Sequence, residues 1–200
     1  MRNNVVPEHS AHCRSCKERV GELLAALYGD CHANYSFSWS AKPQDYEGTA
    51  IGEVLRQIRD GLEQLRGHRE FIKSPQIPPC DFYLPNPRFI VEFDESQHFS
   101  RPRLVTLSFY PPDFRAGFPL GRWQELCRLI DAKDDTPYDR DERRAWYDTL
   151  RDLVPTLHRF NPTARLYADE FHWCALHSDS KEDQERFASI SKDRLPARAV

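Results

Sequence analysis

Three acidic residues stand where two neighbouring strands are expected to bring them together. Asp81 begins the first strand, and Glu92 and Asp94 end the second, after the apolar run FIV. Side chains two residues apart in a strand share a face, and a hairpin places Asp81 opposite them. Clustered carboxylates repel one another, and a hard cation such as Mg²⁺ relieves that repulsion. The spacing therefore predicts a divalent-metal site made by Asp81, Glu92 and Asp94.

Gln97 and His98 follow these acids closely along the chain. Their side chains are suited to bond an attacking water or a phosphate, and a neutral histidine can act as a general base. A bound Mg²⁺ would polarise a phosphate and lower the pKa of a coordinated water. A simpler alternative stays open, in which Glu92 and Asp94 cap a strand end at the surface and pair with nearby arginines.

The segment 80–99, CDFYLPNPRFIVEFDESQHF, resembles the PD-(D/E)XK nuclease superfamily. The likeness is to its branch of very-short-patch-repair-like endonucleases, whose pattern is D-F, a hairpin, and then an apolar residue followed by E-x-D-x-x-x-H. Asp81, Glu92, Asp94 and His98 match that pattern. The resemblance implies a restriction-endonuclease-like core and hydrolysis of DNA phosphodiester bonds, in defence or repair. It also implies that Mg²⁺ or Mn²⁺ is the cofactor.

The resemblance extends more loosely to both sides of this segment. A helix before the first strand often carries an acid that faces the site in this superfamily, and Glu53 is the matching residue. A later D-x-x-R motif is matched by Asp141 and Arg144. The chain departs from the family at Asp94, where a lysine is usual, so a positive charge must come from elsewhere. The candidates to supply it are His98, Arg144 and Lys73.

Apolar periodicity predicts the elements that position these residues. The expected helices cover residues 14–28, 48–66, 122–132 and 138–153. The expected strands cover residues 81–84 and 88–94 as a hairpin, residues 103–110, and one or two stretches within 164–176. This order implies an α/β (α+β) fold with a mixed sheet of about four to five strands flanked by helices. We expect a cysteine-containing helical region over 1–43, a core over 44–177 and a charged, loosely held tail over 178–200.

A second candidate metal site lies near the N-terminus. Cys13 and Cys16 form a C-x-x-C pair, and Cys31 and His32 follow the first expected helix. Thiolate and imidazole ligands at this spacing suit a tetrahedral zinc site, with His32 or His9 as the fourth ligand. A second C-x-x-C is missing, so the alternative is that these cysteines are small packed side chains.

One expected helix carries a run of arginines that is suited to line a phosphate track: Arg140, Arg143, Arg144 and Arg151. Acidic residues are interspersed among them. The alternative is therefore an ordinary solvated face, which paired charges on a helix commonly form.

The composition is that of a globular protein, with 40% hydrophobic and 30% charged residues. The net charge of -3 argues against coating of nucleic acid by bulk charge, although a local basic groove remains compatible with it. No apolar run is long enough to span a membrane, and the first residues lack the apolar core of a signal peptide. We therefore expect a cytoplasmic protein without a membrane partner.

The sequence is compatible with three functions. The favoured one is a metal-dependent endonuclease whose partner is nucleic acid, DNA in preference to RNA, with a homodimer left open. The alternative is a catalytically inactive module of the same fold that binds nucleic acid or a protein. The third is a zinc-dependent regulator built on the cysteines.

Overall fold

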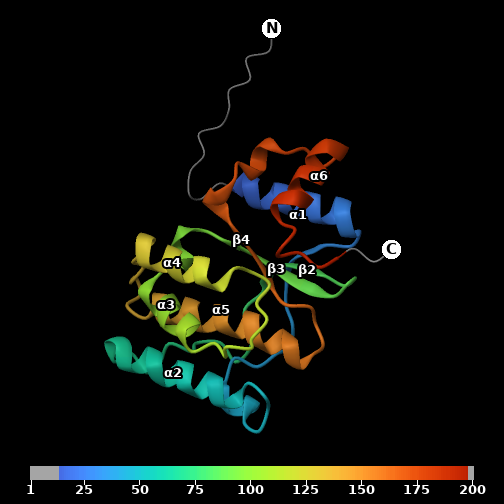
Figure 1. Cartoon of the computed structure of the whole chain (residues 1–200). Coiled ribbons are helices and arrows are strands. Elements are labelled where there is room, and N and C mark those ends of the chain that lie inside the picture. Colours follow the sequence, from blue (N-terminus) through green and yellow to red (C-terminus); the bar gives the residue numbers. More distant parts are fainter. Residues whose placement is uncertain (1–13, 198–200) are drawn as a thin grey trace.

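The computed structural model describes residues 14–197, and within them the chain forms six α-helices and one four-stranded sheet (Figure 1). The strands are β1 (His32–Tyr35), β2 (Cys80–Leu84), β3 (Phe89–Asp94) and β4 (Ala164–Tyr167). They lie in the order β1-β2-β3-β4, with the first two pairings antiparallel and the β3–β4 pairing parallel. The expected α/β class and mixed sheet are confirmed.

The expected hairpin is present as β2 and β3, and its register fixes which side chains face each other. Phe82 pairs with Val91 and Tyr83 with Ile90. One step further along the same register, Asp81 stands opposite Glu92. All six residues of β3 are buried, as expected for a β-branched and aromatic strand covered on both faces.

Two helices from opposite ends of the chain cover one face of the sheet (Figure 1). They are α1 (Arg14–Tyr28), at the bounds expected from its apolar spacing, and α6 (Lys181–Ile190). The expectation of a loosely held tail is wrong. Ser180 caps α6 by accepting a hydrogen bond from the backbone N–H of Asp183, and Phe187 is fully buried against the sheet's core. Ala188 and Ile190 of this helix also pack against the same core, partly buried.

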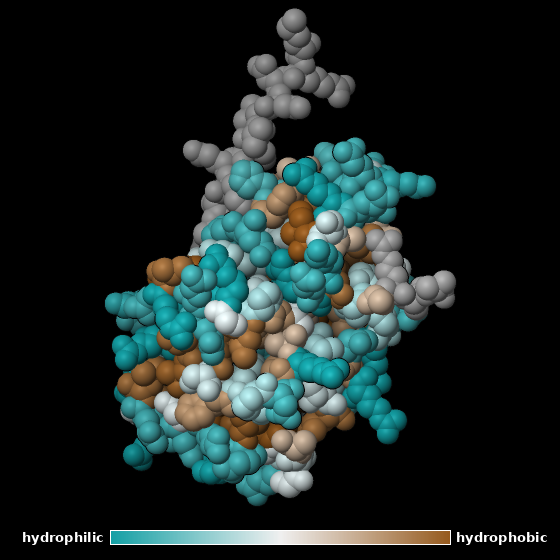
Figure 2. Space-filling model, viewed as in Figure 1, coloured by the Kyte–Doolittle hydropathy of each residue, from teal (hydrophilic) through white to brown (hydrophobic). Residues whose placement is uncertain are grey.

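Four helices form the layer on the other face: α2 (Gly52–Arg66), α3 (Arg101–Ser108), α4 (Leu120–Ile130) and α5 (Arg140–Leu157). α5 packs with α3, which in turn contacts α2 and α4. Figure 1 shows α2 as the helix farthest from the sheet. The surface over this layer shows apolar residues in several places, whereas the surface over α6 is mostly hydrophilic (Figure 2).

Two expected elements differ from the structure for identifiable reasons. The expected strand over 103–110 is instead α3, because Ser100 caps it and Pro102 occupies its first turn. Its buried residues Arg103, Thr106 and Leu107 follow helical spacing, which the alternation of apolar and polar letters disguises. In the expected strand region 164–176, only β4 is a strand, and two short 3-10 turns follow it.

The remaining helices differ from expectation only at their ends. α2 starts at Gly52, four residues later than expected, and α5 runs on to Leu157 through Pro155. Within residues 14–197, no helix is both long and apolar enough to cross a membrane.

The packing of α6 yields a first prediction. Phe187→Ala should lower the free energy of unfolding by about 3–5 kcal/mol, because it removes a fully buried aromatic side chain. Urea denaturation followed by circular dichroism measures this change. Glu185→Ala, on the exposed side of the same helix, is the matched control and should change stability by less than about 0.5 kcal/mol. Equal stability of the two variants would show that α6 does not anchor the sheet.

Candidate functional site

Asp81 and Glu92 lie next to each other where β2 and β3 separate. The backbone N–H of Asp81 donates to Oε1 of Glu92 at 3.3 Å. The Asp81 carboxylate is bonded in turn by the backbone N–H of Phe93 at 2.8 Å and by Nζ of Lys17 at 2.5 Å. These side chains therefore replace ladder hydrogen bonds at the strand ends. The two acids form the pair that the hairpin register predicts.

Asp94 bonds to Arg165 and Trp123 and is not part of the Asp81–Glu92 pair. Its side chain is 1% exposed, Oδ1 accepts from Nη1 of Arg165 at 2.6 Å, and Oδ2 accepts from the indole N–H of Trp123 at 2.7 Å. Both oxygens therefore accept hydrogen bonds from buried donors, and Arg165 compensates the charge. Within residues 14–197, no group of three or more His, Cys, Asp or Glu side chains is arranged to hold a metal ion. The expectation that three carboxylates form one metal site is therefore wrong. Asp94 is not part of the site, and Asp81 and Glu92 are the two acids that remain.

His98 is held by Asp148, an acid that no sequence motif marks as part of the site. Its Nδ1 lies 2.9 Å from Oδ2 of Asp148 on α5, and 3.6 Å from Oδ1 of Asp94. Burial alone would lower the pKa of His98, but the charge and hydrogen bond of the Asp148 carboxylate outweigh it and raise that pKa. Burial opposes ionisation of Asp148 too, yet the charges of His98 and Arg165 hold its pKa well below the usual range. The pair is thus a histidine fixed by a buried carboxylate, with Nε2 left for other partners.

Arg151 supplies the nearest positive charge to Glu92. Its Nε lies 3.5 Å from Oε1 of Glu92, and its Nη1 donates to Asp148 at 3.3 Å. Burial raises the pKa of Glu92 to about 8, Arg151 works against that rise, and the charge of Asp81 adds to it. Burial is the largest of these effects, so Glu92 favours its neutral form unless a further positive charge lies beside it.

These groups open onto one cleft of about 660 Å³ between the strand ends and α5. The residues that line it are Pro78, Asp81, Glu92, His98, Pro137, Arg140, Arg143, Arg144, Tyr147 and Arg151. All four arginines singled out as a phosphate track are among them. Their side of α5 is thus the wall of the cleft, where cationic groups meet two acids and an imidazole.

The other residues of the expected site lie at different distances from this cleft. Arg144 lines it and donates to the backbone carbonyl of Gln97 at 3.2 Å and to Asp134 at 2.7 Å. The amide of Gln97 bonds Glu95 at 2.6 Å and does not line the cleft. Asp141 is fully buried and accepts from the backbone N–H of Asp134, so its role is structural.

Two expected contributors lie outside the cleft. Glu53 is 64% exposed on α2 and pairs with Arg56 at 2.6 Å, so its expected place facing the acids is wrong. The reason is that α2 packs mainly against α3, with fewer contacts to α5, away from the ends of β2 and β3. Lys73 pairs with Asp139 at 3.2 Å and does not line the cleft either.

The expected zinc ligands do not converge in the part of the chain that the structure describes. Cys13 lies outside residues 14–197. Cys16 is part of α1 and is fully buried in the core, whereas His32 is exposed and stacks on Tyr83 with ring centroids 6.0 Å apart. Burial raises the pKa of Cys31 to about 11, which disfavours the thiolate that zinc requires.

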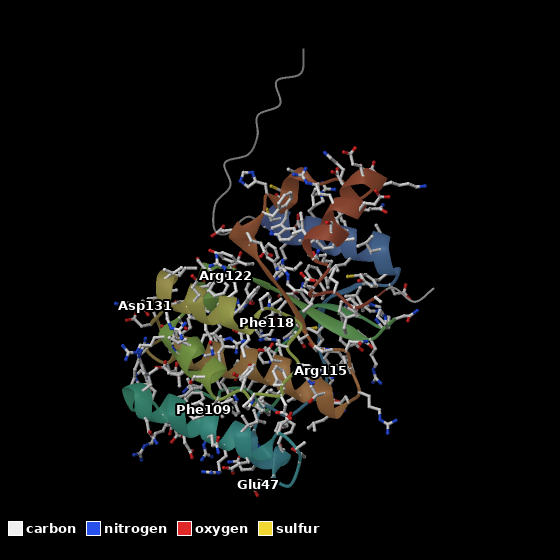
Figure 3. The ribbon with its side chains drawn as sticks, in the orientation of Figure 1. Glu47, Phe109, Arg115, Phe118, Arg122 and Asp131 are labelled. Carbon is white, nitrogen blue, oxygen red and sulfur yellow. The ribbon has the colours of Figure 1, made fainter. Side chains whose placement is uncertain are left out.

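A buried ionic network holds α5 against the sheet behind the cleft. Arg165 of β4 is fully buried and bonds Asp94 on one side and Oδ1 of Asp152 at 2.8 Å on the other. The ring of Phe118 lies 5.7 Å from its guanidinium carbon, and Figure 3 shows Phe118 near the middle of the molecule, before α4. The network keeps the acid-bearing strand and the arginine-bearing helix in fixed relation.

Comparisons with protein-family models, with curated proteins and with solved structures give no match for this chain.

The raised pKa of Glu92 predicts a pH-dependent stability. Unfolded Glu92 ionises near its ordinary pKa of 4.5, whereas in the folded chain it ionises near 8. Between these values the folded state binds more protons, so its stability falls as pH rises, by at most about 1.4 kcal/mol per pH unit. Glu92→Gln should therefore become more stable relative to the parent chain between about pH 5 and about pH 9, without added metal. Urea titrations at both ends measure this. A difference that stays flat with pH, as for the exposed control Glu53→Gln, would contradict it.

Asp94 yields a separate prediction, because its role is structural. Asp94→Asn should lower the free energy of unfolding by about 3 kcal/mol, since it leaves buried Arg165 with less compensating charge. Any rise in melting temperature that Mn²⁺ gives the parent chain should persist in this variant. Parent-like stability combined with loss of the Mn²⁺ effect would instead make Asp94 a metal ligand.

Proposed function

We propose that this chain is a metal-dependent nuclease that hydrolyses phosphodiester bonds of nucleic acid, preferably DNA. One observation carries the proposal: the Asp81–Glu92 pair and the Asp148-held His98 face the same cleft, whose wall is a row of four arginines. Arginine side chains are the usual partners of phosphate oxygens, and two acids beside a histidine suit hydrolysis.

The donors present fit a divalent cation of the Mg²⁺ type. Such an ion commonly takes one or two protein carboxylates and completes its shell with waters and substrate phosphate oxygens. Asp81 and Glu92 are two adjacent acids, and burial raises the pKa of Glu92 to about 8 although Arg151 opposes that rise. A cation bound between the two acids would favour the ionised form of Glu92. When bound, Mg²⁺ or Mn²⁺ supplies Lewis-acid activation of the phosphate and of water.

Residues of the chain would bind the phosphates and accept the proton of the attacking water. The cleft arginines hold the phosphates and fix the strand's direction along α5. His98, with Nδ1 bonded to Asp148, presents Nε2 as the acceptor for a proton from the attacking water. Arg151, 3.5 Å from Glu92, takes the place of the lysine that the superfamily usually has near its glutamate. This is a different residue from the three candidates that the sequence suggested.

The same features support membership of the PD-(D/E)XK superfamily, in its very-short-patch-repair-like branch, as part of the proposal. A hairpin carries Asp81 opposite Glu92, and helices cover both faces of a mixed sheet. A restriction-endonuclease-like core is the arrangement that the motif in 80–99 implies. Proposed roles in defence or repair rest on this likeness.

A second candidate function is a non-catalytic module that binds nucleic acid in the same cleft. It is favoured by the contacts of Lys17 with Asp81 and of Arg151 with Glu92, because protein cations already compensate part of the acids' charge. In that case the arginines bind phosphates and no bond is broken.

Cleavage assays separate the two functions. The full chain should cleave plasmid DNA with Mg²⁺ or Mn²⁺ and not with EDTA, and Glu92→Gln should abolish this. His98→Ala removes the proton acceptor and should lower the cleavage rate by roughly 10²–10⁴-fold. Asp148→Asn leaves His98 in place but weakens the hydrogen bond that holds it, and should lower the rate by less. Glu53→Gln, an exposed acid on α2, should cleave as the parent chain does. Binding of DNA or RNA without cleavage of either, under any of these metals, would favour the non-catalytic module.

A further inference from the structure

Three aromatic rings form a parallel stack that the site described above does not use. The rings of Phe37 and Trp39 have centroids 4.0 Å apart and planes 5° apart. Those of Trp39 and His158 are 4.8 Å apart, with planes 6° apart. His158, the residue that follows α5, is exposed and lies at the outer end of this stack. The stack therefore ends in a flat imidazole that solvent can reach.

The aromatic stack lies near the cleft, to which it is connected by a backbone hydrogen bond at Trp39 and by helix α5. The backbone N–H of Ile77 donates to the carbonyl of Trp39 at 2.9 Å, and the next residue, Pro78, lines the cleft. His158 follows Arg151 by seven residues, close to two helical turns, so the two stand on about the same side of α5. A chain that follows the cleft arginines from Arg140 to Arg151 is thus directed toward His158.

The surroundings of the stack suit a polyanion. Arg88 lies over the ring of Phe160, with its guanidinium carbon 4.5 Å from the ring centroid, and Arg159 is exposed next to His158. The segment 31–44, which carries Phe37 and Trp39, contains neither Asp nor Glu. Burial and the charge of Arg88 lower the pKa of His158, which favours its neutral imidazole.

We propose that the stack Phe37–Trp39–His158 is a subsite for an unpaired nucleic-acid base, which makes single-stranded nucleic acid the preferred substrate class of the cleft. This rests on the proposed function, since the strand must lie along the α5 arginines to reach it. Stacking of a base on an aromatic side chain stabilises binding by about 1–3 kcal/mol. A base inside a duplex is already stacked on both faces and reaches His158 only after it is extruded. The arginines hold phosphates of either form, and the aromatic stack selects the unpaired one.

Anisotropy titrations with labelled oligonucleotides in EDTA test this subsite without cleavage. The probes are a short oligo(dT), a short oligo(rU) and a DNA duplex of matched length. His158→Ala should weaken binding of the single strands by roughly 5- to 150-fold, the equivalent of the stacking energy, and should change duplex binding by less than about twofold. His158→Phe should retain parent-like affinity, because it keeps a flat ring. His177→Ala, which removes an exposed histidine beside α6, is the matched control.

The outcomes distinguish this subsite from the cleft itself. A loss in His158→Ala, restored in His158→Phe, on either single strand supports the subsite. If both His158 variants bind single strands as the parent chain does while Arg143→Ala weakens binding, nucleic acid binds in the cleft but does not stack on His158, and the proposed subsite is wrong. If the parent chain binds neither single strands nor duplex, both proposals are wrong.

Discussion

Arg165 lies fully buried between β4 and α5, and its guanidinium group joins three parts of the molecule. It bonds Asp94 at the end of β3, Asp152 on α5, and the backbone carbonyl of Asp148 one turn earlier. Burying a lone guanidinium group is costly, so these partners must be in place together. Arg165 thereby links β3, β4 and α5, in addition to the backbone pairing of β3 with β4.

That constraint also sets the geometry of the cleft. Asp152 uses its second oxygen to accept from Arg103 at 2.6 Å and from the Tyr110 hydroxyl at 2.7 Å, which draws α3 into the same network. Asp148 stands between Arg165 and His98, so the histidine is positioned by the same helix that carries the arginines. The charged residues of the buried network, such as Arg165 and Asp152, hold the fold together and do not line the cleft. Asp94 belongs to this network, although its sequence motif suggests that it belongs to the cleft.

The sequence was sufficient to predict the elements whose pattern is local. The hairpin, the apolar faces of α1 and α2, and the opposition of Asp81 to Glu92 all follow from periodicity of two or 3.6 residues. α3 was missed because its buried face includes Arg103 and Thr106, which no apolar pattern marks. α6 was missed because Phe187 is its only fully buried residue and most of its other residues are polar.

The site residues divide in the same way. Asp94 was assigned to the metal because its partners, Arg165 and Trp123, are remote in sequence and meet it only after folding. Asp148 was overlooked for the same reason. A signal for it existed, since Asp148 and Asp152 recur at helical spacing among the apolar residues of α5, which places acids on a buried face. Such acids need buried cations, and Arg165 supplies the charge.

We propose that Asp81 and Glu92 hold a divalent cation in an arginine-lined phosphate cleft. A crystal of the chain soaked in Mn²⁺, with data collected for anomalous scattering, tests it most directly. One anomalous peak should lie within ligand distance of both carboxylates, with Lys17 displaced from Asp81. A peak at Asp94 or at the cysteines, or no peak with the Lys17–Asp81 contact intact, would contradict it.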